Sequence, residues 1–167
     1  GSVRMPAGFC NVTGIKPTYG RVSRYGLISL ASSFDCIGPM TRDVYDCATV
    51  LEQIAGHDPQ DSTTYQLPVP NYTKDINKSV KGMKLGIPKE YFVAGMEAGV
   101  ESSIQEAIRT YEKLGMEIHE VSLPNTKYAL PVYYLLLFAE ASSNLARFDG
   151  TRFGLSVSEN AKDVIDI

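Results

Sequence analysis

Ser2 is the residue whose type and setting most suggest chemistry. It follows Gly1 at the head of a stretch punctuated by glycines, prolines and small residues. Glycine allows sharp turns, and proline fixes φ and removes a backbone donor, so we expect residues 1–24 to form a loop, not a regular helix or a central strand. A tight loop around one serine can bring its hydroxyl and several N–H groups to one point, as acyl transfer requires. The alternative is that Gly-Ser is only a chain end or a cloning remnant.

The other potentially reactive side chains do not form a recognisable site. Cys10, Cys36 and Cys47 are odd in number and lack Cys-x-x-Cys spacing, which indicates free thiols and no disulfide framework. His57 and His119 are far apart and have no carboxylate or cysteine at ligand spacing. We therefore expect no metal site.

Charge is unevenly distributed. The formal net charge is −3, yet residues 1–34 hold no Asp or Glu and four cations, Arg4, Lys16, Arg21 and Arg24. Such an opening could attract an anionic substrate group, a phosphate or RNA. No aromatic residues alternate with the cations as in RNA-binding segments, so we favour structural pairing with acidic groups upstream of the chain.

Composition is that of a soluble globular protein. The 167 residues are 44% hydrophobic and 21% charged, and no apolar run reaches the ~18 residues of a membrane helix. No charged, apolar leader is visible. We expect a cytoplasmic protein without a membrane partner.

Periodicity then predicts the elements around the opening loop. Residues 25–31 have strand-like composition. A helix is predicted at about 42–55, with Thr41 as N-cap, Asp43 in the first turn and Gly56 ending it. Its apolar face repeats at helical spacing and consists of Val44, Cys47, Ala48, Leu51, Ile54 and Ala55.

The second half of the sequence predicts an α/β protein. Residues 57–80 are rich in Pro, Asp, Thr and Asn, which indicates a long connection. Residues 83–121 read strand, helix, strand, with Gly115 ending the helix, and this predicts a parallel βαβ unit with a right-handed crossover.

The most apolar segment predicts a helix at about 128–147 that is buried in a larger body, because its first half is apolar nearly all round. Tyr133 and Tyr134 lie on it, and such a pair is more often core than substrate contact. Residues 156–167 suggest a further helix.

Two segments carry a resemblance to a known family. Residues 2–7 (Ser-Val-Arg-Met-Pro-Ala) and 14–23 (Gly-Ile-Lys-Pro-Thr-Tyr-Gly-Arg-Val-Ser) resemble the second half of the amidase-signature motif, and residues 31–44 resemble the segment after that motif. The family's acylated serine lies in Gly-Gly-Ser-Ile/Val-Arg, and Ser2 matches it. Further segments resemble one branch, the glutaminase subunits of tRNA-dependent amidotransferases: 21–26, 87–91, 121–124, 133–135 and 140–150.

The resemblance implies a mixed β-sheet covered by helices, with residues 1–167 forming part of one amidase domain. It implies that Ser2 is the acyl-ester nucleophile and that the N–H groups of Gly1 and Ser2 hold the oxyanion. One of Tyr133 and Tyr134 would lie near bound glutamine. Arg4 would brace the nucleophile loop.

Not every functional residue of the family has a match here. The family's base is a lysine acting through a second serine on a cis peptide, and we expect both upstream of Gly1; Lys16 does not match that lysine. The arginine and aspartate that hold the glutamine α-groups are expected downstream of Ile167. We therefore expect an internal fragment that is inactive alone.

The branch implies the wider function. Glutamine hydrolysis would supply ammonia to a companion B subunit, which uses ATP and magnesium to activate mischarged Glu-tRNA(Gln) or Asp-tRNA(Asn), while a small C subunit joins the two. No cofactor is expected in this chain, and its sequence does not select between the two tRNA acceptors. The alternatives are a stand-alone amidase of the same family acting on small amides and, in another class, a non-catalytic RNA-binding or interaction module.

Overall fold

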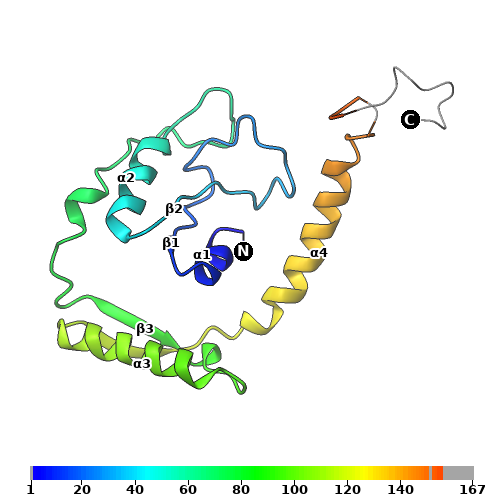
Figure 1. Cartoon of the computed structure of the whole chain (residues 1–167). Coiled ribbons are helices and arrows are strands. Elements are labelled where there is room, and N and C mark those ends of the chain that lie inside the picture. The colour runs from blue at the N-terminus through cyan, green and yellow to red at the C-terminus, as the bar shows by residue number, and fades with distance from the viewer. Residues whose placement is uncertain (1, 151, 156–167) are drawn as a thin grey trace. The chain divides into compact units, whose positions relative to one another are not determined.

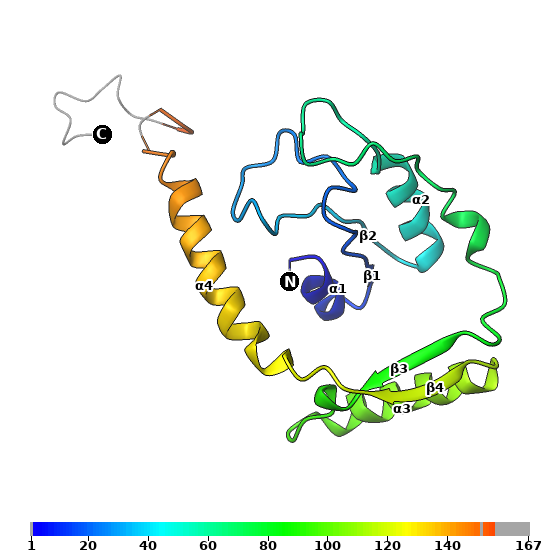
Figure 2. The same ribbon diagram turned by 180° about the vertical axis from the view of Figure 1, so that it is seen from behind.

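The computed structural model describes residues 2–150 and 152–155. The chain divides into two compact units, one of residues 1–73 and 133–167 and the other of residues 74–132, and Figures 1 and 2 label their elements. Gly1 and the helix expected at 156–167 lie outside the described residues. The grouping of the whole chain into one domain stays a prediction.

The first unit carries the segment around Ser2 and the buried core of the described residues. Its elements are α1 (Arg4–Phe9), β1 (Thr13–Gly14), β2 (Met40–Thr41) and α2 (Val44–Ile54), with β1 and β2 antiparallel. The buried apolar side chains of the described residues all belong to this unit: Ala7, Pro17, Val22, Ala31, Pro39, Cys47 and Leu51.

Helix α1 contradicts the prediction that residues 1–24 form only a loop. Pro6 does not prevent the helix, because the first turn of any helix has N–H groups without intrahelical partners. The turn closes through the Ala7 N–H to the Val3 carbonyl at 3.1 Å and the Cys10 N–H to the Pro6 carbonyl at 2.9 Å.

Residues 25–31 are not a strand, so that prediction is wrong. Their composition suits a strand, but no described segment pairs with them. Instead the Asp35 carboxylate accepts from the N–H groups of Leu30 and Ala31, at 3.0 and 3.2 Å. Side-chain bonds of this kind compete with a β-ladder and favour a turn.

Helix α2 forms as predicted, with a corrected start. Asp43, not Thr41, is the N-cap, and its carboxylate accepts from the Asp46 N–H at 2.8 Å. Thr41 belongs to β2. The following connection is irregular up to a single 3-10 turn, η1 (Thr73–Asp75).

The second unit is the predicted βαβ arrangement. It contains β3 (Lys84–Pro88), a 3-10 turn η2 (Lys89–Tyr91), α3 (Ala98–Lys113) and β4 (Glu117–Val121). Strands β3 and β4 are parallel, with Lys84 opposite Glu117. Gly115 has φ of +90°, which suits a glycine after a helix end. The α/β class is confirmed, although the strands form two separate pairs and not one mixed sheet within the described residues.

Helix α4 (Thr126–Leu145) forms close to the predicted position, and its burial in a larger body stays a prediction. None of its side chains is buried, and Leu135 is 74% exposed. Burial of a helix that is apolar all round needs neighbours on every side. In the first unit, hydrogen bonds join the described residues to one face of α4 only.

Candidate active site

Ser2 lines a pocket of about 140 Å³ within the first unit. We call it the Ser2 pocket. Four parts of the sequence form its wall: residues 2–4 at the start of α1, Lys16, the loop of residues 30–36, and residues 133 and 137 of α4. Its lining residues are Ser2, Val3, Arg4, Lys16, Leu30, Ala31, Phe34, Asp35, Cys36, Tyr133 and Leu137.

The position of Ser2 depends on close packing between α1 and β1. Ser2 directly precedes Val3, the N-cap of α1. Ala7 of that helix is 3% exposed, and an added Cβ on Gly14 of β1 would lie 2.6 Å from the Ala7 Cβ. Small residues at both positions therefore let the strand hold the helix that carries Ser2.

The two charged groups that could assist Ser2 are already hydrogen-bonded. The Lys16 ammonium donates to the Pro17 carbonyl at 2.6 Å. The Asp35 carboxylate accepts from the backbone of residues 30 and 31. Among the described residues, no hydrogen bond joins the Ser2 hydroxyl to either of these groups.

The two candidate tyrosines have different surroundings, although their ring centroids lie 5.4 Å apart. Tyr133 lines the Ser2 pocket, whereas Tyr134 does not and instead stacks on Phe138 with ring centroids 5.4 Å apart. The geometry thus brings Ser2 and Tyr133 together. A substrate contact of either tyrosine stays a prediction.

Arg4 also lines the pocket and is exposed. It makes no hydrogen bond or ion pair with any residue in the described part of the chain. The expectation that it braces the nucleophile loop therefore gains no support from these contacts and stays a prediction.

Two residues of this region are absent from the sequence prediction. The Glu140 carboxylate accepts from the Ser33 N–H at 2.9 Å, and the Asn144 amide donates to the Leu30 carbonyl and the Ser32 hydroxyl, both at 3.2 Å. The Ser33 backbone N–H, and then its hydroxyl, lower the pKa of Glu140. The sequence signal for them was polar residues at positions 140 and 144, on the same helical face as Tyr133.

The basic opening makes internal contacts. Arg24 pairs with Asp61 at 3.8 Å, and its guanidinium lies 4.8 Å from the centre of the Tyr19 ring. Arg21 donates to the Tyr72 hydroxyl and the Pro68 carbonyl, each at 2.9 Å. Structural pairing was therefore the better interpretation, but the acidic partner lies downstream, not upstream as expected.

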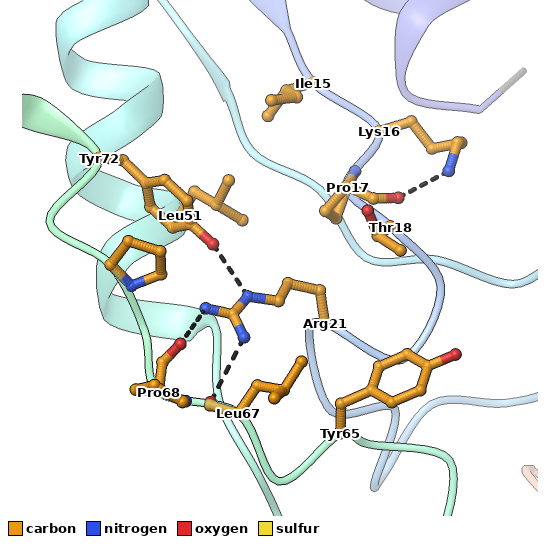
Figure 3. Close-up of a pocket in the computed structure, with 11 residues that line it drawn as sticks. Ile15, Lys16, Pro17, Thr18, Arg21, Leu51, Tyr65, Leu67, Pro68 and Tyr72 are labelled. Atoms are coloured by element: carbon orange, nitrogen blue, oxygen red, sulfur yellow. Dashed lines mark hydrogen bonds between the residues drawn. The ribbon is translucent and has the colours of Figure 1, made fainter. Parts of the chain in front are cut away.

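Arg21 and its hydrogen-bond partners line a second pocket, of about 690 Å³, shown in Figure 3. All three guanidinium nitrogens of Arg21 are drawn in hydrogen bonds there, to Tyr72, Pro68 and Leu67. They tie the 65–72 segment to the start of the chain, which leaves this arginine little freedom to bind an anion.

The described part of the chain holds neither a metal cluster nor a membrane helix. There, no group of three or more His, Cys, Asp or Glu side chains could hold a metal ion. No helix of residues 2–150 and 152–155 is both long and apolar enough to cross a membrane.

The site is thus a serine that precedes a short helix and lines a pocket in an α/β chain. Comparison of the sequence with protein families identifies the family to which the chain belongs. The family model described as Amidase matches residues 1–166. The chain belongs to the amidase family.

Individual relatives show which members of the family the chain is similar to. The A subunit of the glutamyl-tRNA(Gln) amidotransferase of Moorella thermoacetica is 60% identical over 167 residues, and that of Geotalea daltonii is 56% identical over 167 residues. Each alignment covers 100% of this chain and 34% of the relative. The chain thus spans about one third of the length of the curated relatives it matches.

Solved structures agree with the fold. The crystal structure of the glutamyl-tRNA(Gln) amidotransferase A subunit from Thermotoga maritima matches with a TM-score of 0.81 and 42% identity, over 93% of this chain and 33% of that one. The native peptide amidase from Stenotrophomonas maltophilia matches with a TM-score of 0.73 and 29% identity, over 89% of this chain and 31% of that one.

Proposed function

We propose that this chain is the serine-bearing part of a glutaminase, the A subunit of a tRNA-dependent amidotransferase, with Ser2 as the nucleophile. One observation carries the proposal: Ser2 lines a pocket in an amidase-family chain that is 60% identical, along its whole length, to the A subunit of Moorella thermoacetica.

The proposed reaction converts glutamine and water into glutamate and ammonia. The Ser2 hydroxyl oxygen attacks the side-chain carboxamide carbon while its proton passes to a base. The N–H groups of Gly1 and Ser2 stabilise the oxyanion that forms. Collapse of this intermediate breaks the carbon–nitrogen bond, and the protonated nitrogen leaves as ammonia. Water then hydrolyses the glutamyl ester, which restores Ser2.

The base is proposed to be a lysine that acts through a second serine, both outside this chain, as the family resemblance implies. Lys16 and Asp35 are poor alternatives, because their charged groups already hydrogen-bond to backbone groups. The chain alone is therefore expected to release no ammonia from glutamine.

The proposed partners follow from the relatives' names and from the family branch. The B and C subunits of the amidotransferase complete the complex, and the B subunit uses ATP and magnesium to activate Glu-tRNA(Gln) or Asp-tRNA(Asn) for amidation. We propose no cofactor for this chain and a cytoplasmic complex that delivers the ammonia to the B subunit.

The test uses the complete gene product with its B and C subunits. Ser2→Ala should abolish glutamine-dependent ammonia release while leaving tRNA amidation from added ammonium intact. Ser102→Ala is the matched control, because the exposed Ser102 hydroxyl on α3 has no hydrogen bond within the described residues. Ammonia release that survives Ser2→Ala would rule out this nucleophile.

A stand-alone amidase is the second candidate, favoured by the likeness to peptide amidase. It would hydrolyse small amides without the B and C subunits and would not amidate mischarged tRNA. Comparing both substrates with and without the companion subunits separates the two functions.

A further inference from the structure

One face of α4 contains both pocket-lining and hydrogen-bonding residues. Tyr133, Leu137, Glu140 and Asn144 are spaced four, three and four residues apart, which puts them on a single helical face. The first two line the Ser2 pocket, and the last two bind the loop of residues 30–36. Figures 1 and 2 both show this loop beside the C-terminal half of α4.

The loop is itself held on the core. The Ser32 carbonyl accepts from the Tyr19 hydroxyl at 2.8 Å and also from the Arg24 guanidinium. Asp35 binds the backbone of Leu30 from within the loop. A loop restrained at several points is a fixed support, so bonds from α4 to it restrain the helix.

These hydrogen bonds restrict how α4 can rotate about its axis and slide along it. Glu140 and Asn144 lie about one turn apart, so their contacts with Ser33, Leu30 and Ser32 restrict both rotation and sliding of the helix. Tyr133 is seven residues before Glu140, about 10 Å along the axis. A small change at Glu140 therefore shifts the ring of Tyr133 at the Ser2 pocket.

We propose that Glu140 and Asn144, which we call the helix anchor, are positioning residues that fix Tyr133 over the Ser2 pocket for binding of the amide substrate. This inference rests on the proposed function for the identity of the substrate, glutamine. Its structural part, the coupling of α4 to the 30–36 loop, does not.

The ionised state of Glu140 supports the anchor. The Ser33 N–H and hydroxyl lower the pKa of the carboxyl, so it carries its charge at neutral pH. Hydrogen bonds to a charged acceptor are shorter and stronger than neutral ones.

Kinetics of the complete protein with its companion subunits test the anchor. Glu140→Ala should raise the KM for glutamine roughly tenfold, with kcat changing less than about threefold, the effect expected from loss of one charge-assisted bond that orients a binding residue. Glu140→Gln keeps a carbonyl acceptor for the Ser33 N–H and should restore most of the affinity. Glu112→Ala is the control, since the Glu112 carboxylate has no partner among the described residues.

A double-mutant cycle decides whether the anchor acts through Tyr133. In a Tyr133→Ala background, Glu140→Ala should raise KM little further, because the positioned ring is already gone. Additive effects on KM would overturn the proposal.

Hydrogen exchange gives a readout that does not depend on the substrate. Glu140→Ala should speed exchange at the Ser33 amide and across residues 133–145, and Glu112→Ala should not. Unchanged exchange there would overturn the anchor. A wild-type complex that releases no ammonia from glutamine would instead contradict the proposed function, and the exchange result would still decide the anchor.

Discussion

Gly14 and Ala7 approach so closely that a Cβ on Gly14 would lie 2.6 Å from the Ala7 Cβ. The same Cβ would stand 3.3 Å from the carbonyl oxygen of Val3, the residue next to Ser2. The contact between β1 and α1 therefore positions Ser2, the proposed nucleophile, and has no room for one more methyl group.

Gly14→Ala should displace α1 and reduce both stability and ammonia release. Overpacking of this kind costs about 1–3 kcal/mol, measurable by urea unfolding of the complete protein. Gly8→Ala is the matched control, because a Cβ there meets nothing within 4 Å and alanine favours the helix. Equal behaviour of the two variants would refute this account of how Ser2 is held.

Tyr133 and Tyr134 should differ in their effect on substrate affinity. Tyr133→Ala removes a wall of the Ser2 pocket and should raise the KM for glutamine about tenfold or more, within the range seen when a contact residue is truncated. Tyr134 does not line that pocket, but its ring centroid lies 5.4 Å from that of Tyr133, so Tyr134→Ala should raise KM less than Tyr133→Ala does. Steady-state glutaminase assays of the full complex compare the two, and a larger effect at Tyr134 would reverse the assignment.

Asp61 should make the first unit sensitive to acid. The Thr63 hydroxyl, followed by the N–H groups of Arg24 and Thr63, lowers the pKa of Asp61 from 3.8 to about 2. A carboxyl whose pKa is lower in the folded state stabilises the fold above its unfolded pKa. That contribution is lost as pH falls from about 4 through about 2.

Asp61→Asn should therefore destabilise the protein at neutral pH, by about 1–3 kcal/mol for loss of a buried charged acceptor. The deficit relative to wild type should shrink in acid, as followed by unfolding at several pH values. Asp75→Asn is the comparison, because within the described residues the Asp75 carboxylate makes an exposed ion pair with Lys78 and no other side-chain contact, and such pairs contribute little. A deficit that stays constant down to pH 2 would contradict this role of the Asp61 charge.

Tyr72 should hold the 65–72 connection through its hydroxyl. Tyr72→Phe removes the acceptor for Arg21, 2.9 Å away, and should cost about 1 kcal/mol, with faster proteolysis of the connection. Tyr65 lines the same pocket (Figure 3), but its hydroxyl has no hydrogen bond in the described part of the chain. Tyr65→Phe should thus be silent, and an equal effect of both variants would exclude the hydroxyl contact as the cause.

Local pattern was sufficient to predict several elements. Helices α2 and α3 follow from apolar residues at helical spacing, and the parallel pairing of β3 with β4 follows from the strand, helix, strand order. These features depend on residues close in sequence. Ser2 and the family likeness were likewise visible in short motifs.

Other features depend on contacts between distant residues, and these the tertiary structure alone decided. Helix α1 forms despite Pro6 because the proline lies in the first turn of the helix, and because the helix packs on Gly14. Residues 25–31 turn because the Asp35 carboxylate satisfies their N–H groups. The juxtaposition of Ser2 with Tyr133, and the support that Glu140 receives from Ser33, join segments more than 100 residues apart. Periodicity assigns a residue to a face of its own helix, but only the packed chain determines what that face contacts.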